Sequence, residues 1–249
     1  MKSLYLAWQA PDRKWFAVGR LDADVANDRY LFGYTKGALH AEKAVGFSPL
    51  PAFPDFRAAY EASELFPLFK NRVLDPNRKN FSEYLQSLGL EHNDPIEILA
   101  VTGGERRTDN LEVFPRIVKD EAGAFVCRFF LHGLRHMPEE ARVRATSLKA
   151  GDQLGVSVEL TNPATRVGIQ LTTRPDYYFV GWTPHYLVAD LLKATSAVDL
   201  IGAKVVLVNM DDVPLNRRVL IEFSGKLPQE VTPMSDAQFQ LITPSRAAA

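Results

Sequence analysis

Short segments in which apolar and polar residues alternate dominate this sequence, and they constrain the fold more than any other feature. Alternation with a period of two is the pattern of a β-strand that buries one face. Near the N-terminus it occurs three times, at 4–8, 15–21 and 30–34, with turn-rich residues between. These segments predict a three-stranded antiparallel meander.

A proline-rich stretch at 47–55 follows the meander and cannot be helical, because proline lacks the backbone N–H that a helix interior needs. The patterns after it predict two helices, then a helix or a strand, then a strand, at 60–71, 81–88, 95–101 and 111–114. Together these elements predict a mixed domain over residues 1–118, with a small antiparallel sheet and helices.

Beyond a charged turn at 119–123 the pattern is mainly one of strands. Six are expected, at 124–132, 153–160, 168–172, 178–182, 203–209 and 219–223, with helices at 138–146 and 184–193. Short strands with one or two intervening helices predict an OB-like β-barrel over residues 124–230. The polar segment 231–249 is expected to be a flexible tail, and the whole chain belongs to the α+β class.

The charge balance restricts the kind of partner. The chain has 29 lysines and arginines against 30 aspartates and glutamates, a formal net charge of −1. This argues against a protein whose main work is non-specific electrostatic binding to nucleic acid or anionic membrane, so any nucleic-acid site must be a local patch. The apolar runs are too short for a signal peptide or a membrane helix, and we expect a cytoplasmic protein with no membrane partner.

Residues that could carry catalysis are few. His132 and His136 have a metal-ligand spacing, but Gly133 between them predicts the exit of a strand, and structural hydrogen bonding is the expected role. Cys127 lies among bulky apolar residues that would raise its thiol pKa. Gly103 and Gly104 precede two arginines but lack a Walker lysine, which favours an exposed turn. We therefore expect no catalytic residues, metal or cofactor, with a hydrolase built on the two histidines as the remaining enzymatic alternative.

Aromatic and basic residues are interleaved in the second half of the chain. They are Arg128, Phe129, Phe130, Arg174, Tyr177, Tyr178, Trp182, His185 and Tyr186. Exposed aromatic rings on a barrel face stack on unpaired bases while Arg or Lys holds phosphates. Alternating aromatic residues in strands are also often half core, so only part of this set is expected to face solvent.

Residues 124–227 carry motifs whose order and spacing resemble the HIRAN family. The motifs are Arg128-Phe129-Phe130 leading to His132-Gly133, Leu148-Lys149-Ala150-Gly151-Asp152, Glu159-Leu160-Thr161-Asn162-Pro163 and Val180-Gly181-Trp182-Thr183-Pro184-His185. The resemblance implies an OB-like fold with a face that holds the 3' end of single-stranded DNA. Carried over by position, it places Phe129, Phe130, Trp182 and His185 on that face, with Phe223 beside it on the last strand.

The chain departs from this family after Asn162-Pro163. Where the family has Tyr-Asp, with a carboxylate that receives the terminal hydroxyl, this sequence has Ala164 and Thr165, followed by Arg166. The stacking ring and the carboxylate are both missing. We therefore expect Arg166 to contact a phosphate instead, which shifts recognition toward the backbone.

Residues 4–115 resemble the small N-terminal subdomain of HipA-type kinases. The matching segments are Val18-Gly19-Arg20-Leu21, Tyr30-Leu31-Phe32-Gly33-Tyr34, Pro49-Leu50-Pro51, Ser63-Glu64-Leu65-Phe66-Pro67 and Phe81-Ser82-Glu83-Tyr84-Leu85. In that family these segments make protein contacts and precede kinase lobes, for which no motif follows here. The two resemblances together imply a bacterial HIRAN-domain protein with a HipA-like first domain.

The sequence thus predicts a non-enzymatic module that binds single-stranded nucleic acid or DNA ends. The expected binding residues are Arg128, Phe129, Phe130, Asn162, Arg166, Trp182, His185 and Phe223. The alternative is a protein-interaction adaptor in which the HipA-like domain docks a partner. The choice between DNA and RNA, the recognition of a 3' end, and the oligomeric state stay open.

Overall fold

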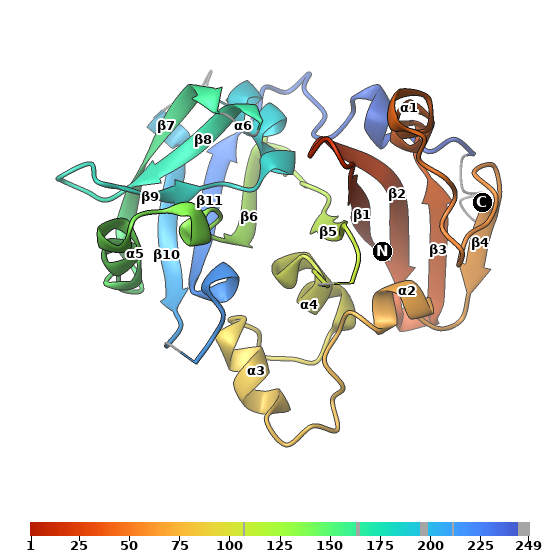
Figure 1. Cartoon of the computed structure of the whole chain (residues 1–249), viewed down its shortest axis with the longest axis horizontal. Coiled ribbons are helices and arrows are strands. Elements are labelled where there is room, and N and C mark those ends of the chain that lie inside the picture. The colour runs from red at the N-terminus through yellow and green to blue at the C-terminus, as the bar shows by residue number, and fades with distance from the viewer. Residues whose placement is uncertain (107, 163–164, 195–198, 211, 244–249) are drawn as a thin grey trace. The chain divides into compact units, whose positions relative to one another are not determined.

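The computed structural model describes residues 1–106, 108–162, 165–194, 199–210 and 212–243. They form two compact units, each built on one antiparallel sheet with helices (Figure 1), so the α+β class is confirmed. Unit 1 comprises residues 1–81, 92–116 and the C-terminal residues from 234, and unit 2 comprises residues 82–91 and 117–233.

Unit 1 contains a five-stranded sheet in the order β4-β3-β2-β1-β5. The strands are β1 (Lys2–Gln9), β2 (Trp15–Asp24), β3 (Arg29–Tyr34), β4 (Ala59–Ala62) and β5 (Leu111–Pro115). Its helices are α1 (Lys36–Val45), α2 (Pro67–Lys70), α4 (Pro95–Thr102) and the short 3-10 turns η1 (Val25–Asn27) and η6 (Ala237–Phe239). The predicted meander of β1, β2 and β3 is confirmed.

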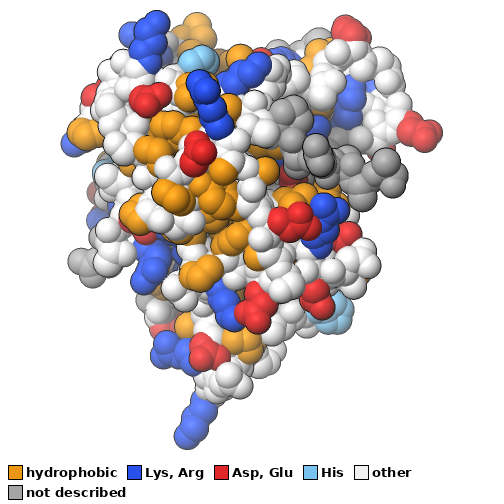
Figure 2. Space-filling model, turned by 90° about the vertical axis from the view of Figure 1, so that its right-hand side faces the viewer, with side chains coloured by type: hydrophobic (Ala, Val, Ile, Leu, Met, Phe, Trp, Pro, Cys, Tyr) orange, Lys and Arg blue, Asp and Glu red, His pale blue; other side chains and the backbone are white. Residues whose placement is uncertain are grey.

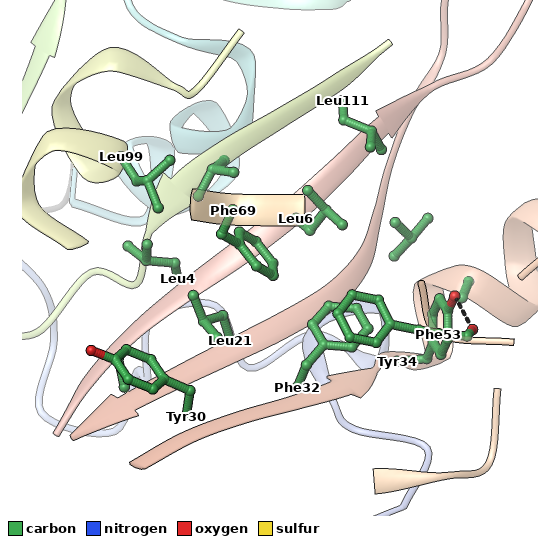
Figure 3. Close-up of a cluster of buried hydrophobic side chains, with 14 of the residues drawn as sticks. Leu4, Leu6, Leu21, Tyr30, Phe32, Tyr34, Phe53, Phe69, Leu99 and Leu111 are labelled. Carbon is green, nitrogen blue, oxygen red and sulfur yellow. Dashed lines mark hydrogen bonds between the residues drawn. The ribbon is translucent and has the colours of Figure 1, made fainter. Parts of the chain in front are cut away.

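The core of unit 1 lies on one face of this sheet (Figure 3). Phe32 of β3 stacks on Phe53 with ring centroids 3.9 Å apart. The buried Tyr34 hydroxyl donates to the Phe53 carbonyl at 2.7 Å and accepts from the Leu50 N–H at 2.6 Å. The proline-rich stretch therefore covers the sheet, held by hydrogen bonds at two of its non-proline residues, the Leu50 N–H as donor and the Phe53 carbonyl as acceptor.

The structure corrects one local prediction in unit 1 and decides another that was left open. The helix predicted over 60–71 is wrong at its start, where β4 pairs with β3 through Phe32 and Tyr60. The helix α2 begins only at Pro67, because the residue before a proline is disfavoured in the α conformation. For the segment at 95–101 the structure has a helix, α4, whose N-cap residue Asp94 accepts from the Ile96 and Glu97 N–H groups.

Unit 2 contains a six-stranded sheet in the order β6-β11-β10-β7-β8-β9. The strands are β6 (Ala124–Phe130), β7 (Gln153–Asn162), β8 (Arg166–Thr172), β9 (Phe179–Trp182), β10 (Gly202–Val208) and β11 (Val219–Lys226), which confirms all six predicted strands. Its helical elements are α3 (Phe81–Ser87, in unit 2 from Ser82), η2 (Leu134–His136), α5 (Glu139–Thr146), η3 (His185–Leu187), α6 (Val188–Ala194) and η5 (Leu215–Arg217).

The two outer strands of this sheet meet at one point. His132, just beyond β6, pairs with Trp182 at the end of β9. The backbone N–H of each residue donates to the carbonyl of the other, at 3.0 and 3.1 Å. These two hydrogen bonds fix the end of β9 against the exit of β6.

The predicted boundary at residue 118 does not describe residues 82–91. This segment packs on unit 2, where Gly89 lies against the side chains of Leu207 and Leu220. The Asn209 amide donates to the Ser87 carbonyl at 2.8 Å. The partners of Ser87 and Gly89 lie more than 100 residues further along the chain, which a local pattern does not reveal.

The prediction of a flexible tail over 231–249 is wrong for residues 234–243. Met234 and Phe239 are only 3% and 6% exposed, and the segment belongs to unit 1. These two apolar side chains are buried while Ser235, Asp236 and Gln240 between and after them are exposed, which explains why the composition resembles that of a tail. Residues 244–249 lie outside the described part of the chain.

Candidate nucleic-acid interface

Three of the predicted binding residues belong to the core of unit 2. Phe129, Phe130 and Phe223 are 2%, 4% and 1% exposed. Alternation along β6 turns Phe125, Cys127 and Phe129 inward, and the Phe125 ring stacks on that of Phe223 with centroids 6.5 Å apart. Placing these three phenylalanines on a binding face is therefore a wrong prediction, because buried rings cannot stack on bases.

Arg128 alternates with these residues and points outward. Its guanidinium donates twice to one carboxylate oxygen of Glu222, at 2.9 and 2.7 Å, while Lys204 lies 3.0 Å from the other oxygen. The hydrogen bonds from Arg128 and then Lys204 lower the pKa of Glu222. The structure thus engages Arg128 in an ion-pair cluster on β6, β10 and β11.

Trp182 and Asn162 are brought together by a residue that the sequence analysis did not single out. One carboxylate oxygen of Glu159 accepts from the Trp182 indole N–H and from the Asn162 amide, each at 2.8 Å. The hydrogen bond from Asn162 is the main cause of a lowered Glu159 pKa, with contributions from Trp182 and Gln170, so this carboxylate is charged at neutral pH. Its only sequence signal was its place in the Glu-Leu-Thr-Asn-Pro motif.

The Trp182 ring needs a glycine beneath it. Gly133 has φ of +89°, and a Cβ built there would lie 2.2 Å from a carbon of the Trp182 ring. Trp182 itself is half-buried. The backbone at Gly133 therefore packs directly on the indole, which is also held at its N–H by Glu159.

Arg166 lies at the tip of the β7–β8 hairpin, paired with Asn162. Asn162 Oδ1 accepts from the Thr165 N–H and hydroxyl, both at 3.0 Å, so Thr165 serves the turn. The Arg166 side chain is exposed. Pro163 and Ala164 lie outside the described residues.

His185 is a neutral side chain rather than a cation. Burial, with a smaller effect of His132, lowers its pKa to about 3. Burial and then Arg135 lower the pKa of His132 to about 4. A neutral imidazole offers no charge to a phosphate, so His185 is not the basic residue that the sequence predicts.

The remaining candidates for chemistry have structural surroundings. Cys127 is buried, and burial raises its thiol pKa to about 12, in the direction that the sequence predicts. Gly103 and Gly104 are buried at the C-terminal end of α4, so the prediction of an exposed turn is wrong there. Arg107 lies outside the residues that the structure describes. Within the residues that the structure does describe, no group of three His, Cys, Asp or Glu side chains could hold a metal ion.

The exposed aromatic side chains of unit 2 lie in the loop before β9. Tyr177 is 72% exposed and Tyr178 40%. The Arg144 guanidinium of α5 lies 5.0 Å from the centroid of the Tyr178 ring and forms an ion pair with Asp176. The loop is thereby fixed to α5, and Tyr177 is held at φ of +53°, a conformation that non-glycine residues adopt at an energetic cost.

This loop continues directly into the aromatic residues of β9. The Phe179 and Trp182 rings are in edge contact with centroids 4.5 Å apart. We call Tyr177, Tyr178, Phe179 and Trp182 the β9 aromatic surface. Of the predicted site it retains Trp182, and its two tyrosines come from the interleaved set of aromatic and basic residues.

Arginines flank the β9 aromatic surface. Arg166 lies at the hairpin tip, at the start of β8, and the exposed Arg174 lies just beyond its end. Most of their separation is β8, which is about 20 Å long between its end Cα atoms. Beside Tyr178 a shallow pocket of ≈ 520 Å³ is lined by Arg144, Val143, Ser147 and the carboxylates of Glu139 and Glu140.

Comparison with protein-family models, with curated proteins and with solved structures gave no match for this chain. Among the described helices, none is long and apolar enough to cross a membrane.

Proposed function

We propose that unit 2 is a non-enzymatic module that binds single-stranded nucleic acid along the β9 aromatic surface. One observation carries the proposal: Tyr177 and Tyr178 are exposed on a loop fixed by Arg144 and Asp176, next in the chain to the half-buried Phe179 and Trp182. Base stacking on such rings contributes about 1–3 kcal/mol per base and accepts any sequence.

The dimensions support a short single strand. The length of β8 between the two arginines, about 20 Å, accommodates several nucleotides, because stacked bases in a duplex are spaced about 3.4 Å apart along each strand. Unpaired bases would stack on the rings, and the two arginines would contact phosphates. A duplex hides its base faces, so we expect it to bind more weakly.

The local charge supports binding through bases more than through phosphates. Arg144 is already paired with Asp176, and the carboxylates of Glu139, Glu140 and Glu159 lie close to the rings. With two arginines, Arg166 and Arg174, that form no ion pair among the described residues, the salt dependence should be shallow, since each phosphate contact on a single strand contributes a slope of about −0.7. This agrees with the nearly neutral charge of the chain.

The finer description of the fold is part of the same proposal. The backbone pairing of His132 with Trp182 joins the outer strands of the sheet, and this supports an OB-like barrel as the form of unit 2. A HIRAN-like origin for unit 2, a HipA-like origin for unit 1 and a cytoplasmic location remain proposals. The burial of Phe129, Phe130 and Phe223 argues for a binding surface different from the one that the resemblance implies.

The proposal is tested by the anisotropy of labelled 12-nucleotide DNA and RNA strands titrated with the full chain at low salt. Tyr177→Ala should weaken binding by about 1–3 kcal/mol, and Arg174→Ala should weaken it and reduce the salt slope. Arg128→Ala is the matched control, because Arg128 is engaged with Glu222. Undetectable binding of every strand, or equal effects of the two arginine variants, would contradict the proposal.

A second candidate function is protein adaptor through unit 1. Figure 2, which shows the side where β4 lies in Figure 1, has hydrophobic side chains gathered near the middle of that face. Unit 1 also has half-buried aromatic residues at the margin of its core, including Trp8, Phe16, Phe56, Tyr60 and Phe66. Under this alternative the chain binds no single strand, and a Phe56→Glu variant loses a protein partner that the native chain retains.

A further inference from the structure

The C-terminal segment 234–243 is bound to unit 1 in the manner of a docked peptide. Its only regular element is the single turn η6, so contacts with unit 1 provide nearly all of its order. Phe239 is the main anchor. Its ring centroid lies 4.9 Å from that of Tyr5 and 6.4 Å from that of Phe114.

Phe239 covers the face of the sheet that the main core leaves open. Tyr5 and Phe114 are directly paired across β1 and β5. Leu4 and Leu6, the neighbours of Tyr5 in sequence, belong to the core on the other face, because successive side chains of a strand point to opposite faces. The segment therefore fills an apolar position on this second face.

Main-chain hydrogen bonds hold the rest of the segment. The Lys36 N–H donates to the Gln240 carbonyl at 2.7 Å, and the Ile242 N–H donates to the Tyr34 carbonyl at 2.9 Å. Leu241 forms a bridge with Thr35 between them. This is the geometry by which a sheet edge or strand end accepts an added peptide, with backbone bonds for affinity and side-chain pockets for selection.

Two small residues leave room for the segment. A Cβ at Gly33 would lie 3.1 Å from Leu241 Cδ2, and a Cβ at Gly37 would lie 2.9 Å from the Gln238 carbonyl oxygen. Past Leu241 and Thr243 the same surface continues into a pocket of ≈ 310 Å³, with the Arg29 and Glu61 ion pair among its lining residues. We call the surface that receives residues 234–243 the C-terminal groove.

We propose that the C-terminal groove is a peptide-docking site, filled by the chain's own segment and able to accept segment 234–243 of a second copy. The bonds between groove and segment do not depend on the covalent connection, so an exchange between two copies preserves every one of them. Residues 227–233 connect strand β11 to the segment and include Pro228 and Pro233. The backbone N–H groups of Leu227 and Val231 donate hydrogen bonds near the start and the middle of this stretch. This inference is independent of nucleic-acid binding.

Docking within one chain should dominate in dilute solution, because a short connection gives the segment a high effective concentration. Exchange should therefore appear when the protein is concentrated or when the connection is cut. Both conditions can be imposed on the full-length protein.

The first experiment introduces a specific protease site between Val231 and Pro233 of the full chain. After cleavage the released segment should stay bound during gel filtration, and a labelled peptide of residues 234–243 should displace it. A peptide with Phe239→Ala should bind at least 10-fold more weakly, whereas Ser235→Ala, at an exposed position, should bind within about 2-fold of the native peptide. Loss of the cut segment together with no binding of the labelled peptide overturns the proposal, whether or not unit 1 stays folded.

The second experiment mixes two differently tagged full-length chains at high concentration and dilutes them before capture. We expect mixed pairs that are absent without the concentration step and are reduced by Leu241→Ala. A Gly33→Val variant, which fills the groove where Leu241 packs, should reduce them further. Monomers alone after every treatment overturn exchange between copies.

Discussion

Glu112 of β5 is 4% exposed and lies opposite Ala7 of β1, with its side chain against Gly103 at the end of α4. Burial, with a smaller effect of Glu105, raises its pKa to about 8 from an ordinary value of 4.5. The folded protein therefore keeps a proton on Glu112 at neutral pH, whereas the unfolded chain releases it. Stability from this group is fully present below pH 4.5 and is lost as the pH rises toward 8.

The size of this effect follows from the pKa shift. Each pH unit between the two pKa values costs about 1.4 kcal/mol, so at pH 7 the penalty is on the order of 3 kcal/mol. Glutamine has the same shape and does not ionise. Glu112→Gln should therefore raise the free energy of unfolding at pH 7 by up to about 3 kcal/mol, with little change near pH 4.

The assay is urea unfolding of the native and variant chains at pH 4, 5, 6, 7 and 8, with hydrogen exchange of the β1 and β5 amides as a local probe. Glu42→Gln, on the exposed face of α1, is the control and should show no growing difference with pH. A difference between native chain and Glu112→Gln that stays constant from pH 4 to pH 8, or a less stable variant at pH 8, would refute the reasoning.

Three further predictions concern unit 2. Because the pKa values of His132 and His185 are lowered in the folded protein, the stability that these groups contribute is complete above pH 6.5 and is lost as the pH falls toward about 4, by roughly 1.4 kcal/mol per pH unit for each histidine. His185→Phe should make the free energy of unfolding, measured by denaturant titration, depend less steeply on pH. An unchanged dependence would contradict the lowered pKa of His185. Gly133→Ala places a Cβ 2.2 Å from the Trp182 ring, so it should destabilise by more than about 1 kcal/mol and shift the tryptophan emission, whereas an unshifted spectrum would contradict the packing. Leu88→Ala should cost about 2–5 kcal/mol in unit 2 by chemical denaturation because Leu88 is wholly buried, and a loss confined to unit 1 amides in hydrogen exchange would contradict the placement of α3.

The strands were predictable because their signal is local. Alternation of apolar and polar residues over five to ten positions predicts β6 and the strands of the meander nearly to their terminal residues, because burial of one face of a strand is enough to produce this alternation. The partners of an element are a different matter. The pattern of residues 82–91 is the same whether the segment packs on unit 1 or, as Gly89 does, on Leu207 and Leu220 of unit 2, so the sequence placed it in the wrong unit.

The candidate site was predictable only in part for a related reason. Alternation says that about half of the aromatic side chains face inward, but it does not say which half, and Phe129 and Phe223 proved to be core while Tyr177 and Tyr178 are exposed. Glu159 was missed because its role depends on Trp182, 23 residues away in sequence.

The most direct test of nucleic-acid binding compares two labelled strands of equal length and charge, one with bases and one abasic, for binding to the full chain. If the β9 aromatic surface stacks on bases, the base-containing strand should bind at least 10-fold more tightly. Tyr177→Ala should weaken its binding by about 1–3 kcal/mol and leave the abasic strand nearly unaffected. Equal affinity of the native chain for both strands would contradict stacking on this surface.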